Sequence, residues 1–231
     1  MKRILSAICF LTLGVTGCKT ATSFDTPNDL RNITGTLYLT NGRNYHGKLI
    51  VNTDAAFNSP VRLIPDGEKD AMKFNFGDVD RYETRGETYV LKNIRSGMSF
   101  GRNYSFMKRL TKADSRIQMF EDMQVSTSTD RYGSTSKRYE TQYFLQLPGD
   151  ETSNVWALNS NKFVPNFDEK MSKLLSDCPA LATKIANKES GYYYAQVSLF
   201  KEKRAEVLWN IIEEYNRCEI KTVKDKAIMQ K

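Results

Sequence analysis

Thr36-Leu37-Tyr38-Leu39-Thr40 is followed by the dipeptide Asn41-Gly42 and by a run from Tyr45 to Val51. This stretch is the strongest indication of the fold. Both runs carry the β-branched and aromatic residues that suit a half-buried strand. Asn-Gly favours the tight turn of a two-stranded hairpin, because both residues tolerate positive φ. The stretch therefore predicts an antiparallel hairpin near the start of a β-rich domain.

Further β signals continue as far as Pro165. A second hairpin is expected from Asp80 to Ile94 around Arg85-Gly86, and the polar stretch Ser126 to Thr141 is expected to be a long loop or a hairpin tip. The other expected strands are Val61–Ile64, Met72–Phe76, Met107–Leu110 against Ile117–Phe120, and Tyr143–Leu147 with Val155–Leu158. Residues 34–165 thus predict an antiparallel β-meander of about eight to ten strands, closed into a barrel or folded into a sandwich to hide its edges.

After Pro165 the apolar period changes from two to about 3.6, which indicates helices. Residues 166–218 predict a layer of about three helices packed on the β domain, so the fold class is α+β. The last helix has Trp209 at its centre, and burial against the β-hairpins is the simplest interpretation of its apolar stripe. The expected inward positions are Phe167, Met171, Leu174, Leu175, Leu181, Ala182, Ile185, Ala205, Val207, Leu208, Ile211, Ile212 and Tyr215.

The N-terminus resembles a bacterial lipoprotein signal. Lys2 and Arg3 precede an apolar run from Ile4 to Val15 that is too short to span a bilayer as a mature helix. The run ends in Val15-Thr16-Gly17-Cys18, so residues 1–17 are expected to be a cleaved signal peptide. The resemblance implies a lipid on Cys18, with two or more acyl chains holding the protein on a membrane.

The residue after that cysteine is Lys19 rather than Asp, which in the enterobacterial lipoproteins implies the outer membrane. The acidic residues that direct some related lipoproteins to the cell surface are absent from Lys19-Thr20-Ala21-Thr22, so the periplasmic face is expected. Residues 18–33 are polar and predict a lipidated tether. Residues 219–231 predict a disordered basic tail.

Two cysteines remain once Cys9 leaves with the signal and Cys18 carries lipid. Cys178 and Cys218 predict a structural disulfide in an oxidising periplasm, closing a loop of roughly 40 residues. The alternative is two buried free thiols that pack as small hydrophobic side chains. His46 is the sole histidine, and no second thiol lies at ligand spacing, so no metal site is expected.

The mature chain also resembles a family of uncharacterised lipoproteins of Bacteroidota. The resemblance rests on the glycine-containing N-terminal hairpin, on Asp177-Cys178-Pro179 followed by Leu181 to Ile185, and on Glu214-Tyr215-Asn216. It implies no catalytic residues and no cofactor.

Charge bounds the class of partner. Without Lys2 and Arg3 the balance falls from 34 − 27 = +7 to 32 − 27 = +5, and the charges are spread along the chain. Such spread is typical of a solvated surface, and export excludes nucleic acid as the sensible partner. Anionic lipid, lipopolysaccharide or an acidic glycan is the more sensible class of ligand, and an envelope protein or a glycan is the expected partner.

Patterns with catalytic potential are few. Ser134-Thr135-Ser136-Lys137 matches Ser-x-x-Lys but lies in a polar tract, and His46 has no partner for nucleophilic catalysis. The pairs Asp78 with Asp80, Glu121 with Asp122 and Glu213 with Glu214 are interpreted as surface charge. Gly-x-x-Tyr-x-x-Lys occurs twice, as Gly42, Tyr45, Lys48 and as Gly86, Tyr89, Lys92, and is typical of a tight turn before a half-buried strand.

Two functional hypotheses follow from these patterns. The first is a membrane-anchored envelope lipoprotein that acts as a non-enzymatic structural or binding module. The second is an envelope hydrolase that cleaves a glycan or peptidoglycan with carboxylates converging only in three dimensions.

Overall fold

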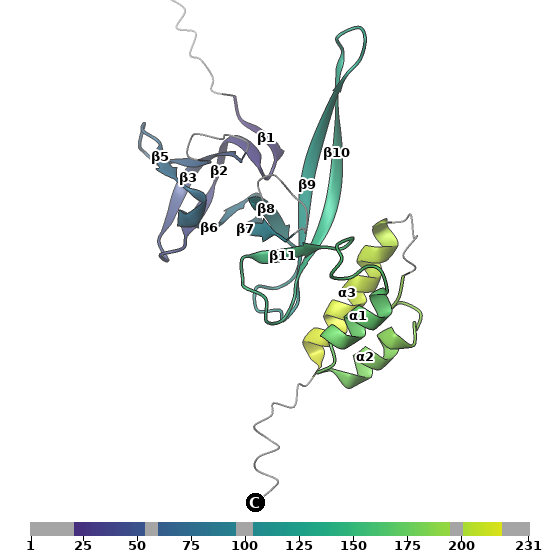
Figure 1. Cartoon of the computed structure of the whole chain (residues 1–231). Helices are drawn as coiled ribbons and strands as arrows, with labels where there is room; N and C mark the ends of the chain where they lie inside the picture. Colours follow the sequence, from purple (N-terminus) through teal and green to yellow (C-terminus); the bar gives the residue numbers. More distant parts are fainter. Residues whose placement is uncertain (1–20, 54–59, 96–103, 195–200, 219–231) are drawn as a thin grey trace, which may run out of the picture.

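The computed structural model describes residues 21–53, 60–95, 104–194 and 201–218. Its strands form one sheet of mainly antiparallel pairs, in the order β11-β10-β9-β8-β7-β6-β2-β3-β4-β5, with β1 paired to β2 (Figure 1). A short 3₁₀ helix, η1 (Phe76–Asp78), precedes β6. The strands are β1 (Ser23–Thr26), β2 (Asp29–Leu39), β3 (Asn44–Asn52), β4 (Val61–Pro65), β5 (Met72–Phe74), β6 (Val79–Thr84), β7 (Glu87–Ile94), β8 (Tyr104–Arg109), β9 (Gln118–Thr129), β10 (Thr135–Gln146) and β11 (Asn154–Ala157).

The hairpin predicted around Asn41-Gly42 is confirmed as β2 and β3. Gly42 adopts a φ of 83° and donates its amide to the Leu39 carbonyl at 3.0 Å. The predicted α+β class is likewise confirmed, with β1 as the strand that the sequence did not indicate.

Five strands close into a ring. β7 to β11 are joined by successive antiparallel pairs, and β11 then returns to pair in parallel with β7 through Asn154 opposite Asn93. One buried side chain from each strand fills the ring, namely Val90, Met107, Phe120, Phe144 and Val155. Strands β7 to β11 thus close on themselves, and β1 to β6 extend the same sheet beyond this ring.

The tether predicted at residues 18–33 is wrong for its described part. Residues 23–26 and 29–33 belong to β1 and β2, and Leu30 is fully buried. The polar groups of this segment form hydrogen bonds inside the protein rather than with solvent. Asn28 accepts the Phe106 amide at 2.8 Å, and the Pro27 carbonyl accepts the Tyr82 hydroxyl at 2.7 Å. The β domain therefore begins before Thr34.

Residues 126–141 form a hairpin tip, one of the two alternatives expected. β9 and β10 pair along their whole length, from Gln118 opposite Gln146 to Thr129 opposite Thr135. Their outer half projects from the sheet, away from the helices (Figure 1).

The three predicted helices are α1 (Phe167–Leu174), α2 (Pro179–Ala186) and α3 (Lys201–Arg217). They pack on one side of β9 and β10 (Figure 1), where Met119 and Leu145 join Met171, Leu181 and Leu208 in one buried cluster. None of the helices in these described ranges has both the length and the apolar character needed to cross a membrane.

Trp209 lies beside the buried stripe of α3 rather than within it. Its side chain is 37% exposed, whereas Leu208, Ile212 and Tyr215 are buried as expected. Trp209 follows Leu208 by one position, which is about 100° round the helix. When Leu208 faces the core, Trp209 therefore lies at the edge of the buried face, where it is partly exposed. The predicted signal at 1–17, the lipid site Cys18 and the predicted tail at 219–231 lie outside the described residues.

Candidate functional site

The sequence motifs with catalytic potential do not form a site. His46 is exposed, with Nδ1 at 3.1 Å from the Thr36 hydroxyl and Nε2 at 3.7 Å from Asp66. Ser134 to Lys137 lie on the projecting hairpin tip, where Lys137 forms an ion pair with Asp25 of β1. No described group of three or more His, Cys, Asp and Glu side chains is arranged to hold a metal ion.

The carboxylate pairs are likewise engaged in local contacts. Asp78 accepts the Asn75 amide at 3.0 Å, while Asp80 binds Arg81 at 2.8 Å. Glu213 binds Arg217, and Glu214 accepts both Lys184 and the Tyr192 hydroxyl.

Asp122 is an exception to the surface interpretation. It is only 2% exposed and accepts hydrogen bonds from Ser105 at 2.8 Å, Gln124 at 3.2 Å and Asn28 at 3.4 Å. Burial raises the pKa of Asp122, and these three donors oppose that rise. The sequence missed this site because its partners come from β8 and from the segment predicted as a tether.

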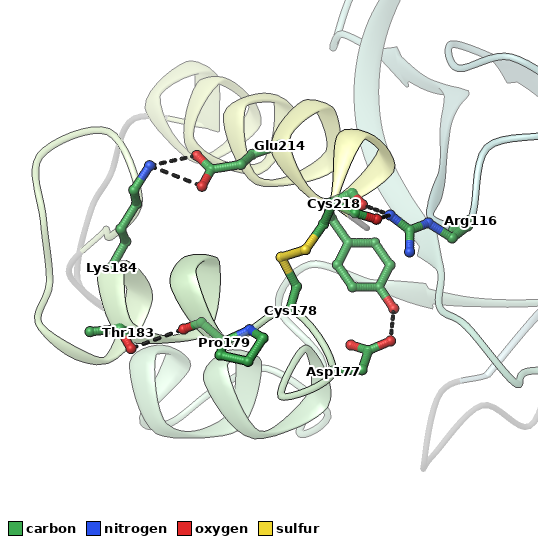
Figure 2. Close-up of a disulfide and its surroundings, with 9 residues drawn as sticks. Arg116, Asp177, Cys178, Pro179, Thr183, Lys184, Glu214 and Cys218 are labelled. Carbon is green, nitrogen blue, oxygen red and sulfur yellow. Dashed lines mark hydrogen bonds and ion pairs between the residues drawn. A yellow bond between two sulfur atoms is a disulfide. The ribbon is translucent and has the colours of Figure 1, made fainter. Parts of the chain in front are cut away.

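The disulfide between Cys178 and Cys218 is confirmed, with their Cα atoms 6.1 Å apart (Figure 2). Around it, Tyr215 donates its hydroxyl to Asp177 at 2.7 Å. Arg116, from the loop before β9, donates to the carbonyls of Tyr215 and Cys218 at the end of α3 (Figure 2). A cation there complements the negative end of the helix dipole.

The motifs Asp177-Cys178-Pro179 and Glu214-Tyr215-Asn216 form structural contacts. Asp177, Cys178 and Tyr215 tie α3 to the start of α2, and Asn216 accepts the Arg116 amide at 2.9 Å. Together they hold the helical layer to the loop before β9.

The candidate site is a pocket of about 410 Å³ beside the ring, well within the size of small-molecule sites. Residues distant in sequence meet there because β6 to β9, β10 and the loop before β11 all contribute to its wall. Its lining includes the side chains of Thr40, Phe76, Asp80, Arg81, Lys92, Tyr104, Arg109, Gln118, Gln146 and Ser153.

Lys92 is the most unusual of these side chains, because it is a lysine with an exposed fraction of only 5%. Its ammonium donates to Gln146 Oε1 at 2.8 Å and to the Thr152 carbonyl, and lies 4.5 Å from the centre of the Phe120 ring. Burial, and then the nearby charge of Arg109, lowers the pKa of Lys92 from 10.5 to about 8. The residue is thus a buried cation with neutral hydrogen-bond partners.

Arg109 is the second cation of the pocket. Its Nε atom is buried and has no hydrogen-bond partner among the described residues. Burial and the charge of Arg81 lower the pKa of Arg109 as well. Arg81 pairs with Asp80 at 2.8 Å and with Glu83 at 3.5 Å. The negative charge of Asp80 partly offsets the lowering of the pKa of Lys92 and Arg109, but neither of these two cations forms an ion pair within the described chain.

One weak signal for this pocket is present in the sequence. Lys92 ends the second Gly-x-x-Tyr-x-x-Lys copy, but Lys48 of the first copy is exposed on β3. The duplication therefore does not mark a shared ligand feature. Nothing in the sequence indicated Arg109.

Comparison with known proteins adds no further constraint: no family model, no curated protein and no solved structure matches the chain.

Proposed function

We propose that this protein is a lipoprotein anchored through Cys18 to the periplasmic face of the outer membrane, with its β domain serving as a non-enzymatic binding module. The anchor is supported by Val15-Thr16-Gly17-Cys18 behind a short apolar segment. The binding role is supported by one observation, the pocket in which Lys92 and Arg109 lie without carboxylate partners.

The alternative of a carboxylate-based hydrolase has less support. Glycoside hydrolysis needs two carboxyl groups facing each other across the scissile bond. Within the described part of the chain, Asp80 is the only carboxylate among the residues that line this pocket, and it is bonded to Arg81. The pocket therefore has donors for a ligand but no acid and base pair.

The anchor is tested by metabolic labelling with palmitate followed by membrane fractionation. Cys18→Ser is expected to lose both the label and the membrane association. Cys9→Ser is the matched control, because Cys9 lies inside the signal and should be dispensable for lipid attachment. Equal labelling of the Cys18→Ser protein and the wild type would refute the anchor.

The non-enzymatic role is tested by incubating the purified protein with peptidoglycan and measuring released reducing ends. We expect no release above that of heat-inactivated protein. Release that Asp80→Asn abolishes would instead establish the hydrolase.

A further inference from the structure

Lys92 and Arg109 have hydrogen-bond donors left over. A lysine ammonium has three donors, and Gln146 and the Thr152 carbonyl accept two of those of Lys92. Arg109 retains its buried Nε–H. Neither side chain forms an ion pair with any described carboxylate.

Keeping two such cations in one pocket costs stability. A buried charge is expensive unless it is paired, and the two positive charges repel each other across the pocket. An anion between them would remove both the cost of burying unpaired charge and the repulsion between the two cations. It would supply the missing negative charge and accept hydrogen bonds from the free donors. Charge-assisted bonds of this kind are about twice as strong as neutral ones.

The rest of the lining indicates what carries that anion. Gln118, Gln146, Thr40 and Ser153 line the pocket with amides and hydroxyls. Gln118 already donates to a carbonyl, Gln146 accepts from Lys92 and Thr40 donates to a carbonyl, so the donors and acceptors that these groups have left are the ones that can meet sugar hydroxyls. Phe76 and Tyr104 stack with ring centres 5.7 Å apart, and Tyr104 is 46% exposed. An exposed aromatic ring beside hydroxyl and amide groups suits the apolar face and the polar rim of a sugar.

We propose that this pocket binds an acidic saccharide, with the phosphate or carboxylate of the sugar held between Lys92 and Arg109. This inference rests on the proposed binding role and specifies its ligand class. It is independent of the lipid on Cys18, so failure of the palmitate test leaves it standing, and its own failure leaves the anchor standing.

The test is calorimetric titration of the full lipidated chain in a nonionic detergent. The probes are glucose 6-phosphate and glucuronate, which separate a phosphate source from a carboxylate source. Glucose and inorganic phosphate are the neutral and the sugar-free controls. We expect at least one acidic sugar to bind about tenfold or more tighter than either control, and its affinity to fall with added salt.

Two variants locate the binding. Lys92→Met keeps the apolar stem over Phe120 but removes the charge, and Arg109→Gln removes the second cation. Each should weaken binding of the acidic sugar about tenfold or more. Lys48→Met is the matched control, because Lys48 holds the same place in the first sequence repeat but is exposed. The affinity of this variant for the acidic sugar should stay at the wild-type value.

Thermal melting of each variant separates lost binding from lost folding. If Lys92→Met does not fold, Arg109→Gln decides the question, because Arg109 is only partly buried. The proposal is overturned if no acidic sugar binds, if inorganic phosphate or glucose binds as tightly, or if folded Arg109→Gln retains wild-type affinity.

Discussion

Replacing Lys92 by Met should change how the stability of the protein depends on pH. In the folded state the pKa of Lys92 is about 8, against an ordinary 10.5, because the ammonium is buried beside Arg109. As the pH rises through about 8, the folded protein releases this proton while the unfolded chain still holds it. The cost of burying the charge is therefore fully present below pH 8 and disappears as the pH approaches 10.5.

The magnitude follows from the difference between the two pKa values. One unit corresponds to about 1.4 kcal/mol, so a difference between 10.5 and about 8 amounts to about 3 kcal/mol. Met carries no proton, so the variant lacks this pH dependence. The free energy of unfolding of the wild type should rise relative to that of Lys92→Met by about 3 kcal/mol between pH 7 and pH 10.5.

Urea unfolding of both proteins at a series of pH values measures this difference, and the subtraction removes the titration of other groups that the two proteins share. Arg81, whose pKa is raised, keeps its charge over this range, so it does not imitate the effect. A wild-type minus Lys92→Met difference that stays constant with pH would show that Lys92 is solvated, and would refute the buried-cation argument.

Three further outcomes test the frame around the pocket. Replacing both Cys178 and Cys218 by Ala should lower the free energy of unfolding by about 4 kcal/mol, because the bridge closes a separation of 40 residues, and an unchanged urea midpoint would contradict this. Asn28→Ala should cost about 2 to 3 kcal/mol in the same assay, since it leaves the Phe106 amide without its partner and removes one of the three donors to Asp122; Asn41→Ala, in an exposed turn, should cost much less. A fragment beginning at Ala21 should melt cooperatively, whereas one beginning at Asn32 should lose the buried Leu30 and melt at a lower temperature; equal melting temperatures would restore residues 21–31 to a tether.

Local patterns predicted the elements of the fold well, because short-range chemistry decides them. Asn41-Gly42 fixes a turn whatever surrounds it, and the 3.6-residue period places Leu208, Ile212 and Tyr215 on one face of α3. The disulfide was predictable for a related reason, since Cys178 and Cys218 were the only cysteines left after the signal and the lipid site were assigned.

The tether prediction failed because polarity alone cannot tell solvated groups from groups bonded inside the protein. Asn28 and Thr26 look like linker residues, but the Asn28 side chain bonds to Phe106, 78 positions away along the chain. The same limit hid Asp122, whose buried carboxylate is matched by Ser105 on the neighbouring strand β8. Hydrogen bonds to residues distant in sequence determine the burial of both Asn28 and Asp122, and no local sequence pattern encodes such bonds.

The two Gly-x-x-Tyr-x-x-Lys copies show the same limit at the pocket itself. Gly42 and Gly86 both adopt positive φ in the turn that precedes the lysine, although Arg85 also has a positive φ and Asn41 does not. Their lysines nevertheless differ, because β3 lies in the open extension of the sheet while β7 is the strand on which β11 closes the ring. Closure brings Gln146 and the Thr152 carbonyl to Lys92 and covers its stem, whereas Lys48 remains in solvent. The cationic pocket is thus a consequence of one parallel strand pair, Asn154 and Val155 against Asn93 and Ile94, and any change that opens that pair should release Lys92 to water and return its pKa toward 10.5.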